Sequence, residues 1–196
     1  MILKEKIVQE GLKLFSLKGF LSTSMNDILE AADTSKGGFY NHFKSKEELF
    51  FAVLEKAGII WRERNLAGLD KIESPVGKLG KLLDNYCNRY LKDSKNFPGG
   101  CVFITLSTEL NDQRPHLSRE VDKSMAGLKN MINRFLREAQ EKGELKMNVN
   151  TEDATEMLFH SMLGTSIGFG ATKSTESLDR SSRALTGYLD NLKLKA

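Results

Sequence analysis

Two capped short helices between residues 24 and 43 constrain the fold of this chain more than any other feature. Ser24 can accept a hydrogen bond from the backbone at a helix start, and Asp27 occupies the third helical position, which together make a capping box. Ser35 can cap a second short helix. Asp33 lies in the turn between them, where aspartate tolerates left-handed backbone better than most residues. This layout predicts a helix-turn-helix.

The second short helix contains two adjacent glycines, Gly37 and Gly38. Each glycine costs a helix roughly 1 kcal/mol relative to alanine, so two of them in so short a helix need a physical reason. One reason is a close approach of the backbone to a DNA phosphate, which no side chain then obstructs. The alternative is that this stretch is simply a loop. The small or apolar residues that would let the two helices pack are Ile28, Ala31, Ala32 and Phe39.

The rest of the chain is also predicted to be helical. Val, Ile and Thr do not cluster in alternating runs, and the hairpin dipeptide Asn-Gly is absent, which argues against strands. The three prolines suit helix starts or loops. We therefore expect an all-α fold with about nine helices. Their expected positions are residues 3–18, 24–32, 35–42, 46–66, 75–92, 100–111, 115–142, 151–169 and 176–194.

Charge alone does not identify a nucleic-acid partner. The net charge of the 196 residues is +3, and residues 1–50 contain seven lysines and seven acidic residues, which sum to zero. Between Lys36 and Lys46, however, three lysines and His42 occur without an acid, as expected of a surface that faces phosphates. A solvated lysine surface would explain the same run equally well.

Several other classes of protein are disfavoured by composition. Cys87 and Cys101 form no CxxC pair and are expected to be free thiols, and the three histidines lack metal-ligand spacing with either cysteine. We therefore expect no metal site and no cofactor. The longest apolar run, residues 49–54, is far shorter than the ~18–20 residues that span a bilayer. Charges close to the N-terminus argue against a signal peptide, so a cytoplasmic protein without a membrane partner is expected.

An ordered set of residues across the motif resembles the signature of the tetracycline-repressor (TetR) family. The matching residues are Gly19-Phe20-x-x-Thr23-Ser24-Met25-x-Asp27-Ile28-x-x-Ala31-Ala32-x-x-Ser35-Lys36-Gly37-x-Phe39-Tyr40-x-His42-Phe43-x-Ser45-Lys46-Glu47-x-Leu49. The chain departs from the common pattern at Gly11, Asp33, Thr34 and Gly38. None of these departures removes the motif.

The resemblance implies a sequence-specific DNA-binding transcriptional regulator, a repressor that a small-molecule effector releases from its operator. It implies a three-helix DNA-binding domain at residues 1–48, with the motif at 24–43, and a helical effector-binding and dimerisation domain at 49–196. The DNA-binding residues carried over are Thr23, Ser24, Ser35, Lys36, Gly37, Gly38, Tyr40, Asn41, His42 and Lys46. A lysine beside a helix N-terminus is a good phosphate site, which supports the last of these.

A surface of small residues in the helix expected at 151–169 suggests how two copies would meet. Gly164 and Gly168 lie one turn apart, with Ser161 and Thr165 nearby. Such residues let two helices approach closely, and the family resemblance implies that the last two helices pair with their copies in a homodimer. A dimer also suits a palindromic operator of double-stranded DNA. The alternative is close packing within one chain.

The middle helices are rich in Met and aromatic residues, which either form ordinary core or line an apolar effector pocket. The candidate effector-binding residues are Tyr86, Cys101, Phe103, Met131, Phe135 and Met162. The effector itself is unknown.

Cys101 has a second possible role. The segment Gly100-Cys101-Val102, with Glu109 further on, resembles a Gly-Cys branch of the family that includes electrophile-sensing repressors. A cysteine at a helix N-terminus has a lowered pKa and more thiolate, although an inert buried thiol is the competing interpretation.

Two other classes of protein compete with the regulator. One is an enzyme, in which Cys101 and His116 would form a thiol–imidazole pair, although nothing in the sequence brings them together. The other is a helical scaffold that binds proteins. The resemblance implies no enzyme activity.

Overall fold

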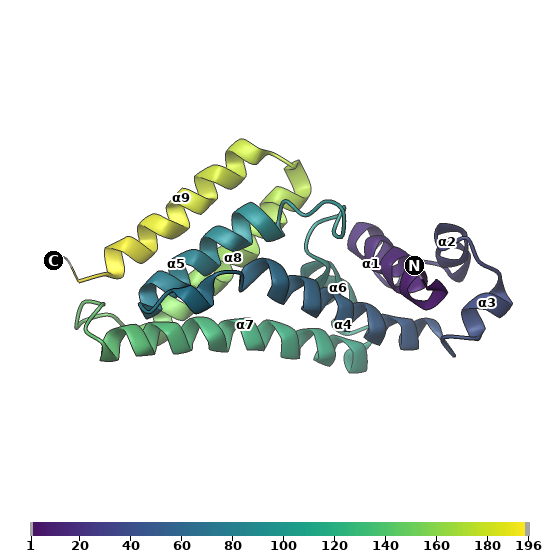
Figure 1. Cartoon of the computed structure of the whole chain (residues 1–196), viewed down its shortest axis with the longest axis horizontal. Coiled ribbons are helices and arrows are strands. Elements are labelled where there is room, and N and C mark those ends of the chain that lie inside the picture. Colours follow the sequence, from purple (N-terminus) through teal and green to yellow (C-terminus); the bar gives the residue numbers. More distant parts are fainter. Residues whose placement is uncertain (1, 195–196) are drawn as a thin grey trace. The chain divides into compact units, whose positions relative to one another are not determined.

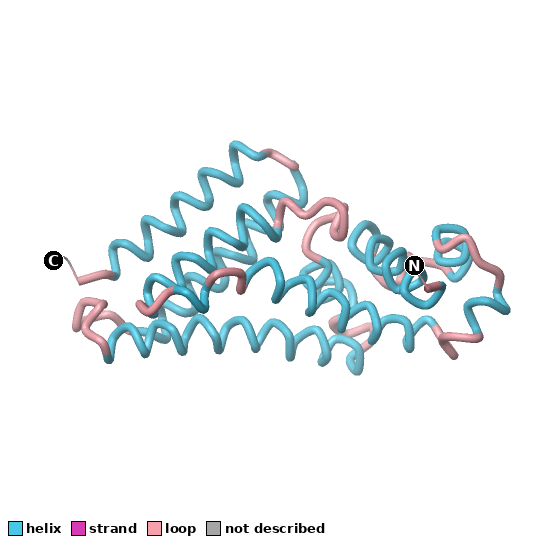
Figure 2. Tube along the Cα trace, viewed as in Figure 1, coloured by secondary structure: helices cyan, strands magenta, loops and turns pink. Residues whose placement is uncertain are grey.

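The computed structural model describes residues 2–194, and its regular elements are helices (Figures 1 and 2). The α-helices are α1 (Leu3–Lys18), α2 (Met25–Ala31), α3 (Lys36–Tyr40), α4 (Lys46–Asn65), α5 (Pro75–Asn85), α6 (Val102–Leu110), α7 (Pro115–Glu141), α8 (Thr151–Thr172) and α9 (Thr175–Leu192). A 3-10 turn, η1 (Leu69–Lys71), and a π-helical turn, η2 (Tyr86–Tyr90), accompany them. Within residues 2–194, extended backbone pairs only at an isolated bridge. The all-α prediction is confirmed.

The helices group into two compact units. The first unit contains the described residues up to Trp61 together with Asp93–Asp122, and the second contains Arg62–Lys92 together with the described residues from Lys123 onward. The first unit therefore includes α6, and along α4 it extends to residue 61, which lies inside that helix. The division of roles between residues 1–48 and 49–196 stays a prediction.

Local hydrogen bonds start the two short helices as predicted. The Ser24 hydroxyl accepts from the Asp27 backbone N–H at 3.1 Å, and the Ser24 N–H donates to the Asp27 carboxylate at 2.7 Å, which confirms the capping box. The Ser35 hydroxyl accepts from the Gly38 N–H at 3.1 Å. Asp33 has a φ of 50°, so the left-handed turn falls at the predicted residue. The helix-turn-helix is thus specified by contacts between residues close in sequence.

Aromatic side chains form much of the core of the first unit. The ring centroids of Phe15 and Phe20, and of Phe20 and Phe50, lie 5.4 Å apart in edge-to-face geometry, and all three side chains are buried. Such pairs contribute about 0.5–1.5 kcal/mol each beyond their burial. α1 and α4 pack closely at Gly11, where an added Cβ would lie 3.2 Å from Val53. This packing supports the short helices that follow α1.

In the second unit, α9 buries Leu178, Leu185 and Leu189, and it packs on α5 and α8. The helix predicted at 75–92 is α-helical only as far as Asn85. It then widens into the π-helical η2 turn, where the Leu91 N–H donates to the Tyr86 carbonyl, five residues back. Helix propensity does not predict such a turn, because its hydrogen bonds span only one residue more than those of an α-helix.

Candidate nucleic-acid interface

Most of the predicted DNA-binding residues lie on exposed surface around α3. Tyr40 is 54% exposed, and Phe39, the next residue back, is fully buried and fixes the helix on the core of the first unit. The Phe39 and Tyr40 ring centroids are 5.4 Å apart in edge-to-face geometry. The exposed members of the predicted set are Ser24, Ser35, Lys36, Gly37, Tyr40 and Asn41, and the half-buried ones are Gly38, His42 and Lys46.

The two glycines of α3 differ in what surrounds them. A Cβ at Gly37 would meet only the Ser35 hydroxyl, at 3.7 Å, so the packing of the chain does not require glycine there. A Cβ at Gly38 would collide with the Thr34 hydroxyl, which gives this glycine a reason within the chain. The hypothesis of a close approach to phosphate therefore remains as the explanation of Gly37 alone. The segment is helical, so the alternative of a plain loop is wrong.

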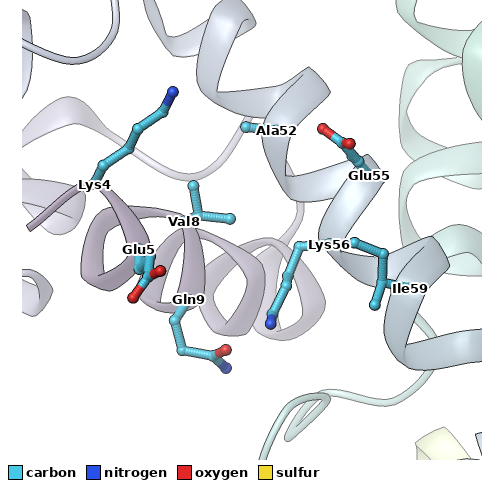
Figure 3. Close-up of a pocket in the computed structure, with 8 residues that line it drawn as sticks. All are labelled: Lys4, Glu5, Val8, Gln9, Ala52, Glu55, Lys56 and Ile59. Atoms are coloured by element: carbon cyan, nitrogen blue, oxygen red, sulfur yellow. The ribbon is translucent and has the colours of Figure 1, made fainter. Parts of the chain in front are cut away.

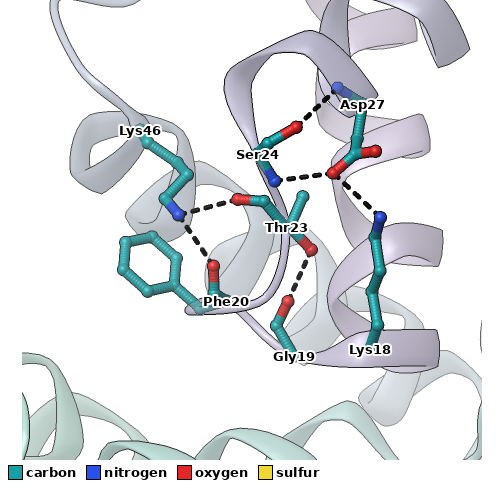
Figure 4. A network of polar contacts seen from close by, with 7 residues as sticks. All are labelled: Lys18, Gly19, Phe20, Thr23, Ser24, Asp27 and Lys46. Carbon is teal, nitrogen blue, oxygen red and sulfur yellow. Dashed lines mark hydrogen bonds and ion pairs between the residues drawn. The ribbon is translucent and has the colours of Figure 1, made fainter.

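Thr23 is not part of the exposed surface. Its side chain is fully buried, and its hydroxyl donates to the Gly19 carbonyl at 2.5 Å (Figure 4). α2 begins at Met25, with Ser24 as its N-cap, so Thr23 lies before the helix. A phosphate contact by this hydroxyl would require its bond to Gly19 to break.

Lys46 is already engaged by the protein. Its ammonium donates to the carbonyls of Phe20 at 2.8 Å and Thr23 at 2.7 Å, and it lies 4.3 Å from the centroid of the Phe20 ring (Figure 4). Burial lowers the pKa of Lys46, and the nearby carboxylate of Glu109 opposes that shift. The predicted phosphate contact would have to compete with these bonds.

A second charged contact fixes the start of α2. The Lys18 ammonium lies 2.8 Å from the Asp27 carboxylate (Figure 4). This ammonium and the hydrogen bonds from Ser24 lower the pKa of Asp27 to about 2. The ionised carboxylate also suits the N-terminal end of the α2 dipole.

Sequence reasoning did not assign a role to Glu109, on α6. Its carboxylate accepts from the backbone N–H groups of Phe20 at 2.6 Å and Leu21 at 2.9 Å. The only sequence signal was its place in the Gly-Cys resemblance. Periodicity could not have found this contact, because the partners lie 88 and 89 residues away.

The candidate effector-binding residues are divided between the two units. Cys101 and Phe103 belong to the first unit, whereas Tyr86, Met131, Phe135 and Met162 belong to the second. In the second unit the Tyr86 hydroxyl donates to the Met162 carbonyl at 3.2 Å. This hydrogen bond brings two of the predicted residues together.

Grooves with other linings are present in each unit. In the first unit, α1 and α4 enclose a groove lined by Val8, Ala52 and Ile59 and rimmed by charged side chains of both signs (Figure 3). In the second unit, a groove between α8 and α9 is lined by Met157, Ser161, Thr165, Ser181, Ala184, Leu185 and Tyr188. The second groove contains two of the predicted dimer-interface residues.

The predicted dimer-interface residues lie on one side of α8. Gly164 and Gly168 are exposed, and a Cβ at either position would meet nothing within 4 Å. Ser161 and Thr165 are half-buried. The alternative, that these glycines permit close packing within one chain, is therefore wrong. The interface itself stays a prediction.

The enzyme hypothesis pairs Cys101 with His116, and each of these residues lies in a different environment. The His116 imidazole lies 3.2 Å from the Glu47 carboxylate on exposed surface, and Cys101 is half-buried at the N-cap of α6.

Among residues 2–194, no group of three or more His, Cys, Asp or Glu side chains could hold a metal ion. None of the helices in that range has the length and apolarity needed to cross a membrane.

A capped helix-turn-helix with an exposed second helix, in an all-helical chain, defines a helix-turn-helix DNA-binding protein. Residues 7–53 match the family model "Bacterial regulatory proteins, tetR family", and residues 75–185 match "Tetracyclin repressor-like, C-terminal domain". The chain belongs to the TetR family of DNA-binding transcriptional regulators. This is a family of regulators rather than of enzymes.

Individual relatives agree with this assignment. An uncharacterised HTH-type transcriptional regulator of Lactococcus lactis is 33% identical over 130 residues, which are 66% of this chain and 65% of that protein. The HTH-type transcriptional repressor NemR of Escherichia coli is 24% identical over 181 residues, which are 90% of this chain and 88% of NemR. The solved structure of a TetR regulator from Chloroflexus aurantiacus superposes with a TM-score of 0.88 at 25% identity, covering 98% of this chain and 97% of that one.

Proposed function

We propose that this protein is a homodimeric repressor that binds a palindromic operator through α3 and leaves it when a small-molecule effector binds. The observation that carries this proposal is the exposed polar and aromatic surface of a short helix that Phe39 anchors in the core. Hydroxyl, lysine and tyrosine groups on such a helix are suited to phosphates and base edges. The proposed site of action is the cytoplasm, where the DNA lies.

The proposed dimer follows from the two-fold symmetry of the proposed operator. A two-fold operator is matched by a two-fold protein, whose recognition helices meet successive half-sites. The open space around Gly164 and Gly168 supports α8 as the surface where the second copy packs. The groove between α8 and α9 extends that surface.

DNA from both sides of the protein's own gene provides the test. We expect one flank to give a specific mobility shift that unlabelled flank DNA competes away and unrelated DNA of the same length does not. The affinity should fall steeply as the salt concentration rises, because binding releases counterions from the phosphates. The absence of a specific shift on either flank would contradict the proposal.

We further propose that Cys101 is the effector-responsive thiol and reacts with electrophiles. Cys101 is half-buried at the start of α6, whereas Cys87 is buried and its pKa is raised to about 11, mainly by burial. Because the thiolate is the nucleophile, the buried Cys87 is a poor nucleophile at neutral pH.

N-ethylmaleimide tests this role of Cys101. We expect it to release the wild-type protein and the control variant Cys87→Ser from the flank DNA, and to leave Cys101→Ser bound. Release of Cys101→Ser at the wild-type concentration of reagent would rule out the sensing role and leave DNA binding intact.

A further inference from the structure

The five residues from Gly19 to Thr23, which connect α1 to the N-cap of α2, are held from two sides by oppositely charged side chains. Glu109 of α6 accepts from their N–H groups, and Lys46 of α4 donates to their carbonyls. Figure 4 shows the lysine side of this arrangement and its continuation to the start of α2. We call these residues the α1–α2 segment.

The carboxylate side is specific in its geometry. The bonds from Phe20 and Leu21, at 2.6 and 2.9 Å, engage both carboxylate oxygens of Glu109. Bonds from N–H groups to an ionised acceptor are about twice as strong as neutral ones. Gly19 has a φ of 80°, and a Cβ there would collide with the same carboxylate. The glycine is therefore required both by the backbone conformation and by the close approach of Glu109.

The lysine side completes the contact. Phe20 donates its N–H to Glu109, and its carbonyl accepts from Lys46, so one peptide segment links α6 to α4. The Thr23 carbonyl is the second acceptor for Lys46, and the next residue is the N-cap of α2. Both charged groups therefore contact the backbone that leads into α2.

α6 is also attached to α1 at its other end. The Ser16 hydroxyl donates to the Gly100 carbonyl at 2.8 Å and accepts from the Gly99 N–H at 3.1 Å. A Cβ at Gly99 would collide with the Ser16 carbonyl. These contacts hold the beginning of α6 against α1, so that Glu109, near its end, is presented to the α1–α2 segment.

We propose that Glu109 is a positioning residue for DNA binding, which holds the α1–α2 segment so that α2 and α3 meet the operator in register. This inference rests on the proposed function. Glu109 itself need not touch DNA, since it acts through the backbone of Phe20 and Leu21.

Glu109→Gln in the full-length chain tests the proposal, with Asp112→Asn as the matched control. Both substitutions remove one negative charge, and Asp112 is exposed just beyond the end of α6. We expect the Kd for the flank that the wild type binds to rise about tenfold in Glu109→Gln and to change less than about twofold in Asp112→Asn. The Kd for unrelated DNA should fall slightly and equally in both variants, because that binding depends on net charge and each variant has lost one negative charge.

The direction of the change in operator Kd distinguishes a positioning role of Glu109 from a purely electrostatic one. Loss of a negative charge alone would strengthen binding to a polyanion, and it would do so in both variants. General destabilisation would weaken binding to operator and unrelated DNA together. In addition, hydrogen exchange of the Phe20 and Leu21 amides should become at least about tenfold faster in Glu109→Gln, because both lose a charged acceptor.

Each outcome decides the proposal. If the wild type and Glu109→Gln bind the operator equally well, the positioning role of Glu109 is contradicted and the proposed function is not. If the wild type binds neither flank specifically, both are contradicted. If Glu109→Gln melts below the assay temperature, Glu109→Asp gives the same comparison. It keeps the charge but draws the carboxylate back by one methylene, so we expect an intermediate loss of operator affinity and none for unrelated DNA.

Discussion

The exposed surfaces of α3 and α8 share one property, since both contain glycines that the packing of the chain does not require. A Cβ would find open space at Gly164 and Gly168, and it would be in ordinary contact at Gly37. At Gly99, in contrast, a Cβ would collide with the backbone of α1. Glycine weakens a helix, and at Gly37, Gly164 and Gly168 it leaves room for a partner outside the chain.

The two surfaces differ in the chemistry that surrounds these glycines. Lys36 and Tyr40 stand beside Gly37, so the surface on α3 suits a polyanion. On α8, Met157 and Ile167 are 53% and 55% exposed, so that surface suits an apolar protein partner. The same feature therefore supports two kinds of proposed recognition, which the neighbouring side chains distinguish.

The largest effect is expected from Gly164→Glu. A carboxylate in the centre of the proposed interface would be buried without a partner, so the dimer Kd should rise about a hundredfold or more. Gly127→Glu on α7 is the matched control, because a Cβ there also meets nothing within 4 Å. Light scattering after size exclusion measures both. If the Gly164→Glu protein remains a dimer, α8 is not part of the dimer interface.

Loss of side chains from α3 should affect DNA without affecting the dimer. We expect Lys36→Ala combined with Tyr40→Ala to weaken operator binding by about tenfold to a hundredfold, because phosphate and base-edge contacts are lost. Lys71→Ala, an exposed lysine in the second unit, provides the control. Fluorescence anisotropy gives the affinities, and unchanged operator binding by the double variant would exclude this surface.

Gly37→Ala should change stability and DNA affinity in opposite directions. Alanine favours the helix by about 0.5–1 kcal/mol, and no neighbour obstructs its Cβ, so the thermal midpoint should rise. Operator affinity should fall several-fold because the methyl group separates the backbone from phosphate. Gly80→Ala, in α5, should raise stability with no change in DNA binding. Full operator affinity in Gly37→Ala would show that no phosphate approaches this position.

The smallest effect concerns pH. The Lys18 ammonium and the bonds from Ser24 hold the pKa of Asp27 at about 2, below its usual 3.8. A carboxyl whose pKa is lowered by folding stabilises the protein above the unfolded pKa, and this contribution is lost as the pH falls toward 2. Asp27→Asn should therefore lower Tm by about 1–3 °C at pH 6, with a difference from wild type that narrows toward pH 3. A difference that widens on acidification would contradict the assigned cause.

The helix-turn-helix was predictable because its determinants are local. The bonds between Ser24 and Asp27, and between Ser35 and Gly38, span three residues each, so their pattern is visible in the chain. The surroundings of Thr23 and Lys46 were not predictable in this way. Thr23 has the residue type of a phosphate contact, but packing within the first unit buries it.

Sequence alone determined the helical class, the caps and the family signature of this protein, because these depend on residue type and short spacing. Tertiary structure decided which glycines lie open to a partner, and it joined Glu109 to residues 88 and 89 positions away. The physical reason is that burial and long-range hydrogen bonds depend on how helices pack, which no local pattern encodes.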